Sequence, residues 1–113
     1  MSEQQLKHVL SVQVLIVDDE VEHAEVMAEA LHRPGHVCTI VNGTQAATEE
    51  LVHGSFDVII TDLVMETETS GLDVLRIAQE HQEDAETIVV TAHGDVATAK
   101  AALQGGAYDF IEK

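Results

Sequence analysis

The sequence of 113 residues suits one domain with a buried core, since a chain of this length covers most of its apolar surface on folding. Its 21 acidic and 5 basic residues give a formal net charge of −16, which argues against direct contact with nucleic acid because phosphates attract basic surfaces. The hydrophobic residues, 45% of the chain, fall in periodic segments too short to span a membrane. With a polar N-terminus unlike a signal peptide, we expect a cytoplasmic domain without membrane contact.

The hydrophobic pattern predicts five strands that alternate with four helices. Apolar, β-branched runs are typical of strands that are buried on both faces. Apolar residues spaced three and four apart, as in the segment after Val21, indicate amphipathic helices. In chain order we expect a lead-in at 1–11, strand 12–17, a helix from 21 that Pro34 stops, strand 36–41, helix 45–53, strand 56–61, helix 71–82, strand 86–91, helix 96–104 and strand 107–111.

Strands and helices that alternate at this spacing form right-handed βαβ units. We therefore predict an α/β fold, a doubly wound parallel sheet with helices on both faces. Thr44 is expected to cap the second helix and Asp95 the fourth, which consists mostly of alanine and should be weakly held. In such sheets ligands bind beyond the carboxyl ends of the strands.

Polar side chains are expected to meet at that carboxyl edge. Asp18 and Asp19 follow the first strand, and Asp62 follows the third. Thr91 ends the fourth strand, and Lys113 follows the fifth. Each residue alone would be an ordinary turn or surface residue, but their convergence on one edge predicts a site.

Carboxylates that lie close together repel one another, which should raise their shared pKa and attract a cation. Oxygen ligands suit Mg²⁺, which also accepts phosphate oxygens. A carboxylate can act as a nucleophile toward phosphorus, while a metal, a lysine and a hydroxyl neutralise the phosphoryl oxygens. The pattern therefore predicts a Mg²⁺-dependent phosphoryl site.

The motifs around these residues together resemble the receiver domains of two-component response regulators. They are Val-Asp-Asp-Glu, Ile-Ile-Thr-Asp-Leu-Val-Met, Val-Val-Thr-Ala and Ala-Tyr-Asp-Phe-Ile-Glu-Lys, and the resemblance covers residues 12–113. It implies a flavodoxin-like five-stranded sheet in the order 2-1-3-4-5. The segment from His93 to Phe110 is most similar to receivers of the nitrogen-regulator class, which precede an ATPase domain that activates alternative-sigma-factor polymerase.

The resemblance implies a role for each acidic residue of the predicted site. Asp62 matches the phosphoacceptor. Asp19, Asp62 and the backbone carbonyl of Val64 match the direct Mg²⁺ ligands, and Asp18 matches the carboxylate that holds metal-bound water.

The resemblance also implies the groups that contact the phosphoryl group. These are the Thr91 hydroxyl, the Ala92 amide and the Lys113 ammonium. Thr91 and Phe110 match the residues that switch conformation after phosphorylation.

Two features depart from the family pattern. Receivers usually carry Met-Pro soon after the phosphoacceptor, followed by a glycine. Here Met65 is followed by Glu-Thr-Glu-Thr-Ser, and Gly71 comes about one residue later than in that pattern. We therefore expect a longer and more mobile loop. Receivers also continue past the last strand with a proline and a further helix, whereas this sequence ends at Lys113. We therefore expect a receiver at 12–113, after the lead-in at 1–11, that lacks its fifth helix.

The resemblance implies a signalling switch and not an enzyme. A histidine kinase would supply the phosphoryl group, and the face formed by 96–111 would contact an output domain, a partner protein or a second copy in a homodimer. Two alternatives stay open: a pseudo-receiver that binds protein without phosphorylation, and a Mg²⁺-dependent aspartyl-phosphate hydrolase. The intact site residues disfavour the first, and Val64 disfavours the second because a hydrolase would need a carboxylate there.

Overall fold

The computed structural model describes residues 11–92 and 95–113. Residues 1–10 of the lead-in expected at 1–11 lie outside this part of the chain, as do residues 93–94 of the turn that Ala92-His93-Gly94 predicts. The described elements, in chain order, are β1 (Gln13–Val17), α2 (Val21–His32), β2 (Val37–Val41), α3 (Thr44–His53), β3 (Val58–Asp62), α4 (Ser70–His81), β4 (Glu86–Thr91), α5 (Val96–Gln104) and β5 (Asp109–Glu112).

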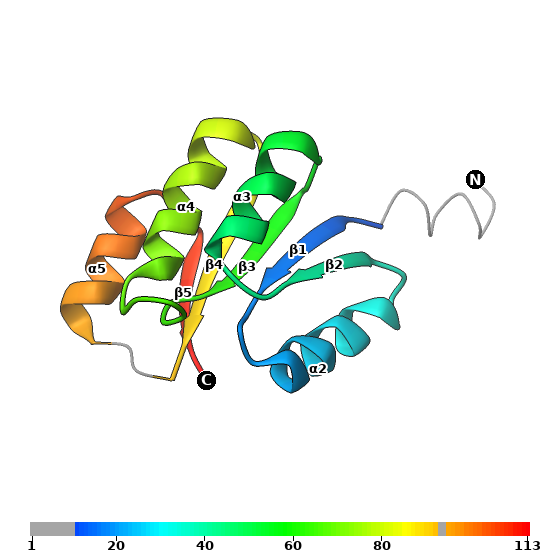
Figure 1. The fold of residues 1–113 in the computed structure, drawn as a ribbon, viewed down its shortest axis with the longest axis horizontal. Helices are drawn as coiled ribbons and strands as arrows, with labels where there is room; N and C mark the ends of the chain where they lie inside the picture. The colour runs from blue at the N-terminus through cyan, green and yellow to red at the C-terminus, as the bar shows by residue number, and fades with distance from the viewer. Residues whose placement is uncertain (1–10, 93–94) are drawn as a thin grey trace.

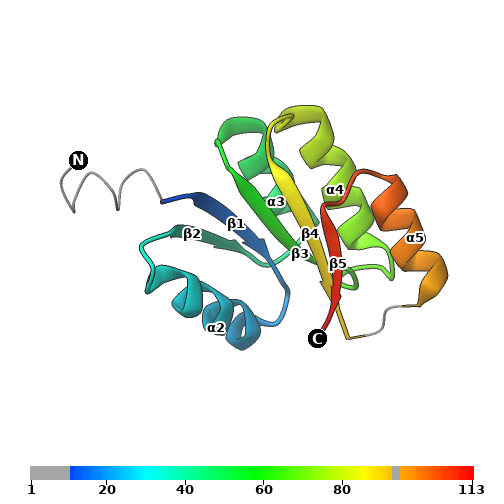
Figure 2. The same cartoon turned by 180° about the vertical axis from the view of Figure 1, so that it is seen from behind.

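The strands form one parallel sheet in the order β2-β1-β3-β4-β5, which confirms the predicted flavodoxin-like arrangement. Figures 1 and 2 show α2 against one face of the sheet and α3, α4 and α5 against the other. Because the strands are parallel, their carboxyl ends meet at a single edge. The further helix implied by the resemblance would follow Lys113 and stays an expectation.

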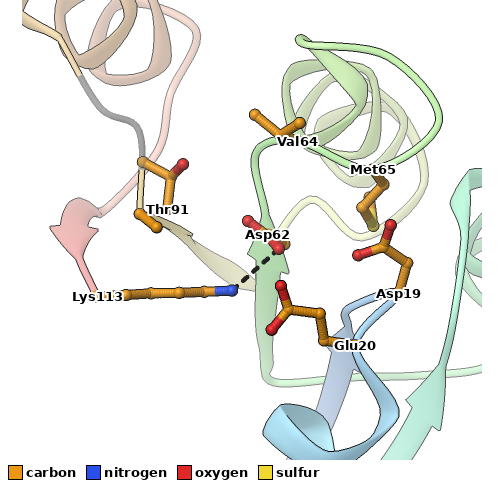
Figure 3. Close-up of a pocket in the computed structure, with 8 residues that line it drawn as sticks. Asp19, Glu20, Asp62, Val64, Met65, Thr91 and Lys113 are labelled. Carbon is orange, nitrogen blue, oxygen red and sulfur yellow. Dashed lines mark hydrogen bonds and ion pairs between the residues drawn. The ribbon is translucent and has the colours of Figure 1, made fainter.

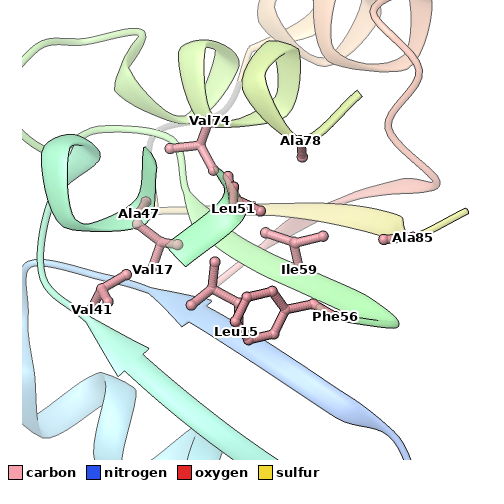
Figure 4. Close-up of a cluster of buried hydrophobic side chains, with 10 residues drawn as sticks. All are labelled: Leu15, Val17, Val41, Ala47, Leu51, Phe56, Ile59, Val74, Ala78 and Ala85. Atoms are coloured by element: carbon pink, nitrogen blue, oxygen red, sulfur yellow. The ribbon is translucent and has the colours of Figure 1, made fainter. Parts of the chain in front are cut away.

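The side chains of β1 alternate between two hydrophobic cores, as the pleat of a strand requires. Val14 and Ile16 pack with Ala24 of α2 on one face. On the other face, a larger cluster lies under α3 and α4 and holds β1 beside β3 (Figure 4). Its members are Leu15, Val17, Val41, Ala47, Leu51, Phe56, Ile59, Val74, Ala78 and Ala85.

The alanine-rich α5 buries little, as its composition predicts. Ala102 is its only buried residue, and it packs in a small cluster with Val89 of β4 and Leu75 of α4. Val96 is 86% exposed and Leu103 is 50% exposed. Burial of apolar area holds helices to sheets, so α5 is attached less firmly than α3 or α4.

Two strands begin two residues later than predicted because side chains and turns compete for the backbone, whereas the other strand boundaries differ by one residue at most. The expected strand from Phe56 begins only at Val58, since the Phe56 amide donates to the side-chain carbonyl of Gln82 at 3.1 Å. The amide group of Gln82 donates in turn to the carbonyls of Leu51, at 2.8 Å, and Gly54, at 2.9 Å. The expected strand from residue 107 begins at Asp109, after a turn that closes α5.

The predicted capping role of Thr44 is wrong. Thr44 is the first residue of α3, and Gly43 occupies the N-cap position without a side chain to accept a hydrogen bond. The backbone amide and the hydroxyl of Thr44 instead donate to the carboxylate of Glu66, each at 2.9 Å. The bond from the Thr44 amide lowers the pKa of Glu66. The cap of α3 thus comes from the loop between β3 and α4.

The predicted capping role of Asp95 is confirmed, because its carboxylate accepts a hydrogen bond from the Thr98 amide at 2.7 Å. Among residues 11–92 and 95–113, no helix has the length and apolar character needed to cross a membrane.

We predict that Asp95→Ala lowers the melting temperature, since α5 loses its cap. The hydrogen bond from the Thr98 amide lowers the pKa of Asp95. The ionised Asp95 therefore stabilises the folded state fully above pH 3.8, the ordinary pKa, and this stabilisation is lost as the pH falls through the lower pKa of the folded state. The difference in melting temperature from wild type should therefore shrink below pH 3.8. Glu25→Ala, which removes an exposed charge within α2, is the control; an equal loss in both variants would contradict the prediction.

Candidate functional site

Asp18 lies completely buried just beyond β1. Two hydrogen bonds hold its backbone to the end of β2. The Asp18 amide donates to the Val41 carbonyl at 3.1 Å, and the side chain of Asn42, the residue after β2, donates to the Asp18 carbonyl at 2.9 Å. Its carboxylate accepts the Glu20 amide at 2.9 Å and contacts the His23 ring at 2.5 Å. A buried carboxylate with these partners is fixed in place before any ligand binds.

Asp62 is the last residue of β3 and is 7% exposed. Lys113 reaches its Oδ2 from the end of β5 at 3.0 Å and lies 3.5 Å from Oδ2 of Asp18. The Lys113 amide donates to the Thr91 carbonyl at 2.8 Å, which extends the pairing of β5 with β4 up to this residue. The ammonium group therefore lies between two carboxylates from different strands.

The carboxylates converge as predicted. Asp18, Asp19 and Asp62 each offer an oxygen within 4.8 Å of the others. A pocket of about 270 Å³ opens above them. Figure 3 shows Lys113 approaching Asp62 from one side while Asp19 lies on the other. The pocket is lined by Asp19, Glu20, Asp62, Val64, Met65, Thr91, Ala92 and Lys113.

Two predicted residues lie outside the lining. Asp18 is buried beside the pocket and touches it through Lys113. Phe110 pairs with Val89 in the sheet and packs, partly buried, against the small cluster beneath α5. Its place on β5 is the one that the resemblance implied, and the switch of its side chain stays a prediction.

Sequence reasoning missed His23, which contacts a site residue, and Glu66, which lies in the loop beside the site. His23 lies in the first turn of α2, from which its ring reaches back to Asp18. A histidine in the first turn of a helix that follows a pair of aspartates was the available signal. Glu66 had no comparable signal, because its partner Thr44 is 22 residues away in the sequence.

The expectation that repulsion raises the pKa of the cluster is wrong for Asp18. Burial raises the pKa of Asp18, but three contacts together outweigh it and lower the pKa. They are the hydrogen bond with His23, the hydrogen bond from the Glu20 amide, and the charge of Lys113. The pKa of Lys113 is raised, because the bond to Asp62 and the charges of Asp62 and Asp18 outweigh its burial. The prediction counted the carboxylates and left out the hydrogen bonds to Asp18 and the charge of Lys113.

Gly71, in the first turn of α4, is pressed against the end of β3. A Cβ atom there would lie 2.4 Å from the Asp62 carbonyl oxygen and 2.7 Å from the Leu63 Cα. The Gly71 amide donates to the Leu63 carbonyl at 2.8 Å. Only glycine leaves room for this contact, so α4 fixes the backbone of Asp62 directly.

The site's donor atoms fit a divalent cation. All three converging side chains are carboxylates, and hard cations such as Mg²⁺ and Ca²⁺ prefer oxygen ligands. Asp19 is exposed and Asp62 lines the pocket, so both oxygens face a space that an ion can enter.

The family model of the response regulator receiver domain matches residues 14–113. Among proteins of similar sequence, the nitrogen assimilation regulatory protein NtrX of Azorhizobium caulinodans is 31% identical over 101 residues, which cover 88% of this chain and 22% of that protein. The chain thus spans about a fifth of the length of such relatives.

Solved structures give the same result. A response regulator from Burkholderia pseudomallei, which contains a phosphorylated aspartic acid, a calcium ion and citrate, matches with a TM-score of 0.84 at 28% identity, over 89% of this chain and 59% of that chain. The beryllofluoride-activated NtrC4 receiver domain dimer matches with a TM-score of 0.81 at 32% identity, over 89% and 83% of the two chains.

We predict that Lys113→Met destabilises the metal-free domain by roughly 1–3 kcal/mol, between the values for exposed and fully buried ion pairs, because Asp18 and Asp62 lose the charge between them. Because the pKa of Lys113 is raised, its contribution to the free energy of unfolding is complete below pH 10.5, the ordinary pKa of lysine. That contribution is lost as the pH rises through the higher pKa of the folded state. The measurement is denaturant unfolding from neutral to alkaline pH. Lys100→Met on α5 is the matched control; equal stability of the two variants would refute the prediction.

We also predict that Gly71→Ala costs about 1–3 kcal/mol of stability, as overpacked sites do, and displaces the backbone of Asp62. Chemical shifts of the Asp62 and Leu63 amides and denaturant unfolding would measure both effects. At Gly105 an added Cβ would lie 3.2 Å from its nearest neighbours, so Gly105→Ala should cost less. Unchanged amide shifts in Gly71→Ala would show that the close contact is not needed.

Proposed function

We propose that this chain, which belongs to the response regulator receiver domain family, accepts a phosphoryl group on Asp62 and acts as the input switch of a two-component system. The observation that carries the proposal is the meeting of Asp62, Lys113 and the other carboxylates in one pocket. The phosphorylated aspartic acid of the Burkholderia pseudomallei relative supports the same chemistry here. The phosphoryl donor is a histidine kinase.

In the proposed transfer, a carboxylate oxygen of Asp62 attacks phosphorus and forms an acyl phosphate. The bond from phosphorus to the kinase histidine breaks, its electron pair stays on the ring nitrogen, and that nitrogen takes up a proton. Lys113 holds Asp62 in position at 3.0 Å and remains beside the new negative charge. The Thr91 hydroxyl and the Ala92 amide, which line the same pocket, are the other donors toward the phosphoryl oxygens.

Mg²⁺ is the proposed cation. Asp19, Asp62 and the backbone carbonyl of Val64 would hold it directly, with Asp18 acting through water. When bound, the ion supplies positive charge that neutralises the phosphoryl oxygens. Val64 lines the pocket, and the carboxylates already lie within the spacing that a common ion requires.

The proposed output is a change of conformation on the α5 side of the sheet. Thr91 turning toward the phosphoryl group would let Phe110 move, and the lightly packed α5 can follow at small cost. The face at 96–111 would then contact an output domain, a partner protein or a second copy, in the cytoplasm. The similarity to NtrX supports an output of the nitrogen-regulator class, an ATPase domain that acts on alternative-sigma-factor polymerase.

Two other functions share these residues, and each makes a different prediction. A pseudo-receiver would bind protein without reacting at Asp62. An aspartyl-phosphate hydrolase would turn over, but it would need an acid at position 64, where this chain has valine. The proposed switch has at most slow self-dephosphorylation.

The test is incubation with acetyl phosphate and Mg²⁺, followed by intact mass and peptide mapping. We expect one phosphoryl adduct on Asp62, its absence in Asp62→Asn, and its retention in Asp73→Asn, which changes an exposed acid on α4. An adduct on another carboxylate would overturn the assignment. Rapid phosphate release would favour the hydrolase, and the absence of reaction would favour the pseudo-receiver.

A further inference from the structure

Glu66 connects the loop between β3 and α4 to a helix that is distant in the sequence. Its Oε2 accepts the Thr44 amide at 2.9 Å, and its Oε1 accepts the Thr44 hydroxyl at 2.9 Å and the Thr44 amide at 3.3 Å. Both carboxylate oxygens are therefore engaged by one residue at the start of α3. Three donor contacts to one carboxylate leave it little freedom to turn.

The neighbouring glycine leaves room for this contact. A Cβ atom on Gly43 would lie 2.8 Å from Oε2 of Glu66. The backbone of Gly43 is extended, with φ −179°, which any residue can adopt. Glycine at this position thus leaves the space that the Glu66 carboxylate occupies, and a larger residue would push that side chain away from Thr44.

The loop that carries Glu66 is tied together by its own hydrogen bonds. The Met65 amide donates to the Thr67 carbonyl at 3.1 Å, and the Thr67 amide donates to the hydroxyl of Ser70 at 2.8 Å. Ser70 is 2% exposed. The loop is thus bonded to itself at two places, and its expected mobility stays a prediction. A restraint at Glu66 reaches Val64 and Met65 through two peptide units at most.

We propose that Glu66 is a positioning residue: its contact with Thr44 holds the loop so that Val64, which lines the cation pocket, keeps its backbone carbonyl available to a cation. The inference rests on the proposed function, in which that carbonyl is a metal ligand. Receivers usually carry a proline in this loop, which restrains the backbone covalently. Here the proline is absent, the loop is longer, and a side-chain contact to α3 supplies the restraint.

The test must separate this role from simple capping of α3, and the chain offers a way to do so. Glu66→Ala removes both the cap and the tether. In the Gly43→Ser/Glu66→Ala double variant the clash with Oε2 is gone, so the serine hydroxyl can cap α3 while the loop stays untethered. Glu68→Ala removes the same charge from the same loop and is the matched control.

Three measurements are made on each variant: the melting temperature, the amide exchange of residues 63–69 without metal, and the Mg²⁺ dissociation constant by calorimetry. Glu66→Ala should melt lower, exchange faster in the loop, and bind Mg²⁺ about tenfold more weakly, a typical loss when the support of a metal ligand is removed. The double variant should recover the melting temperature but neither the slow exchange nor the affinity. Glu66→Gln, which keeps one acceptor oxygen, should recover part of each.

The proposal is overturned if the double variant also recovers the affinity and the slow exchange, because Glu66 is then only a cap. It is equally overturned if Glu66→Ala leaves loop exchange unchanged. Failure of the proposed function looks different: Asp62→Asn would bind Mg²⁺ as well as wild type, while the exchange in metal-free protein would still report on the tether.

Discussion

The ammonium group of Lys113 is the contact on which the site depends. It lies 3.0 Å from Asp62 and 3.5 Å from Asp18, so one cation from β5 faces two nearly buried carboxylates from β3 and the end of β1. Without a positive charge, like charges at this spacing would repel with little water between them. The sheet order makes the contact possible, because it brings the ends of β1, β3, β4 and β5 to one edge. The acidic pocket can therefore exist before a metal ion enters it.

The arrangement around this contact divides the molecule into two parts with different packing. Toward β1, β3, α3 and α4, the main hydrophobic cluster holds the strands together, and Gly71 contacts the backbone of Asp62. Glu66 and Gln82 tie the two ends of α3 to the segments before and after α4. Toward α5, a small cluster around Ala102 is the main buried contact. The carboxylates of Asp18 and Asp62 belong to the first part, whereas Phe110, the residue proposed to transmit the signal, lies against the second. Thr91 and Lys113 reach the pocket from β4 and β5 and so connect the two parts. This division suits the proposed switch, in which the carboxylates keep their positions while the output surface changes.

The fold and most of the site could be predicted from the sequence because both follow from periodic patterns. Buried strands that end in polar residues gave the sheet, and a parallel sheet brings strand ends such as Asp18, Asp62 and Thr91 together. Contacts between distant side chains could not be predicted in this way. Glu66, and not Thr44, caps α3, and His23 with Lys113 reverses the expected direction of the Asp18 pKa. Such partners depend on how loops and helix ends lie in space, which no local period encodes.

The three hydrogen bonds of Gln82 have a mechanical consequence. At one end of α4, Gly71 presses its backbone on β3; just past the other end, Gln82 is bonded to Leu51, Gly54 and Phe56. Because α4 is held at both ends, it can neither slide along its axis nor pivot without breaking the contacts of Gly71 or of Gln82. The helix next to it, α5, lacks a second support of this kind among the described residues. We therefore expect a change of conformation on the α5 side of the sheet, while α4 and the backbone of Asp62 that it contacts keep their positions.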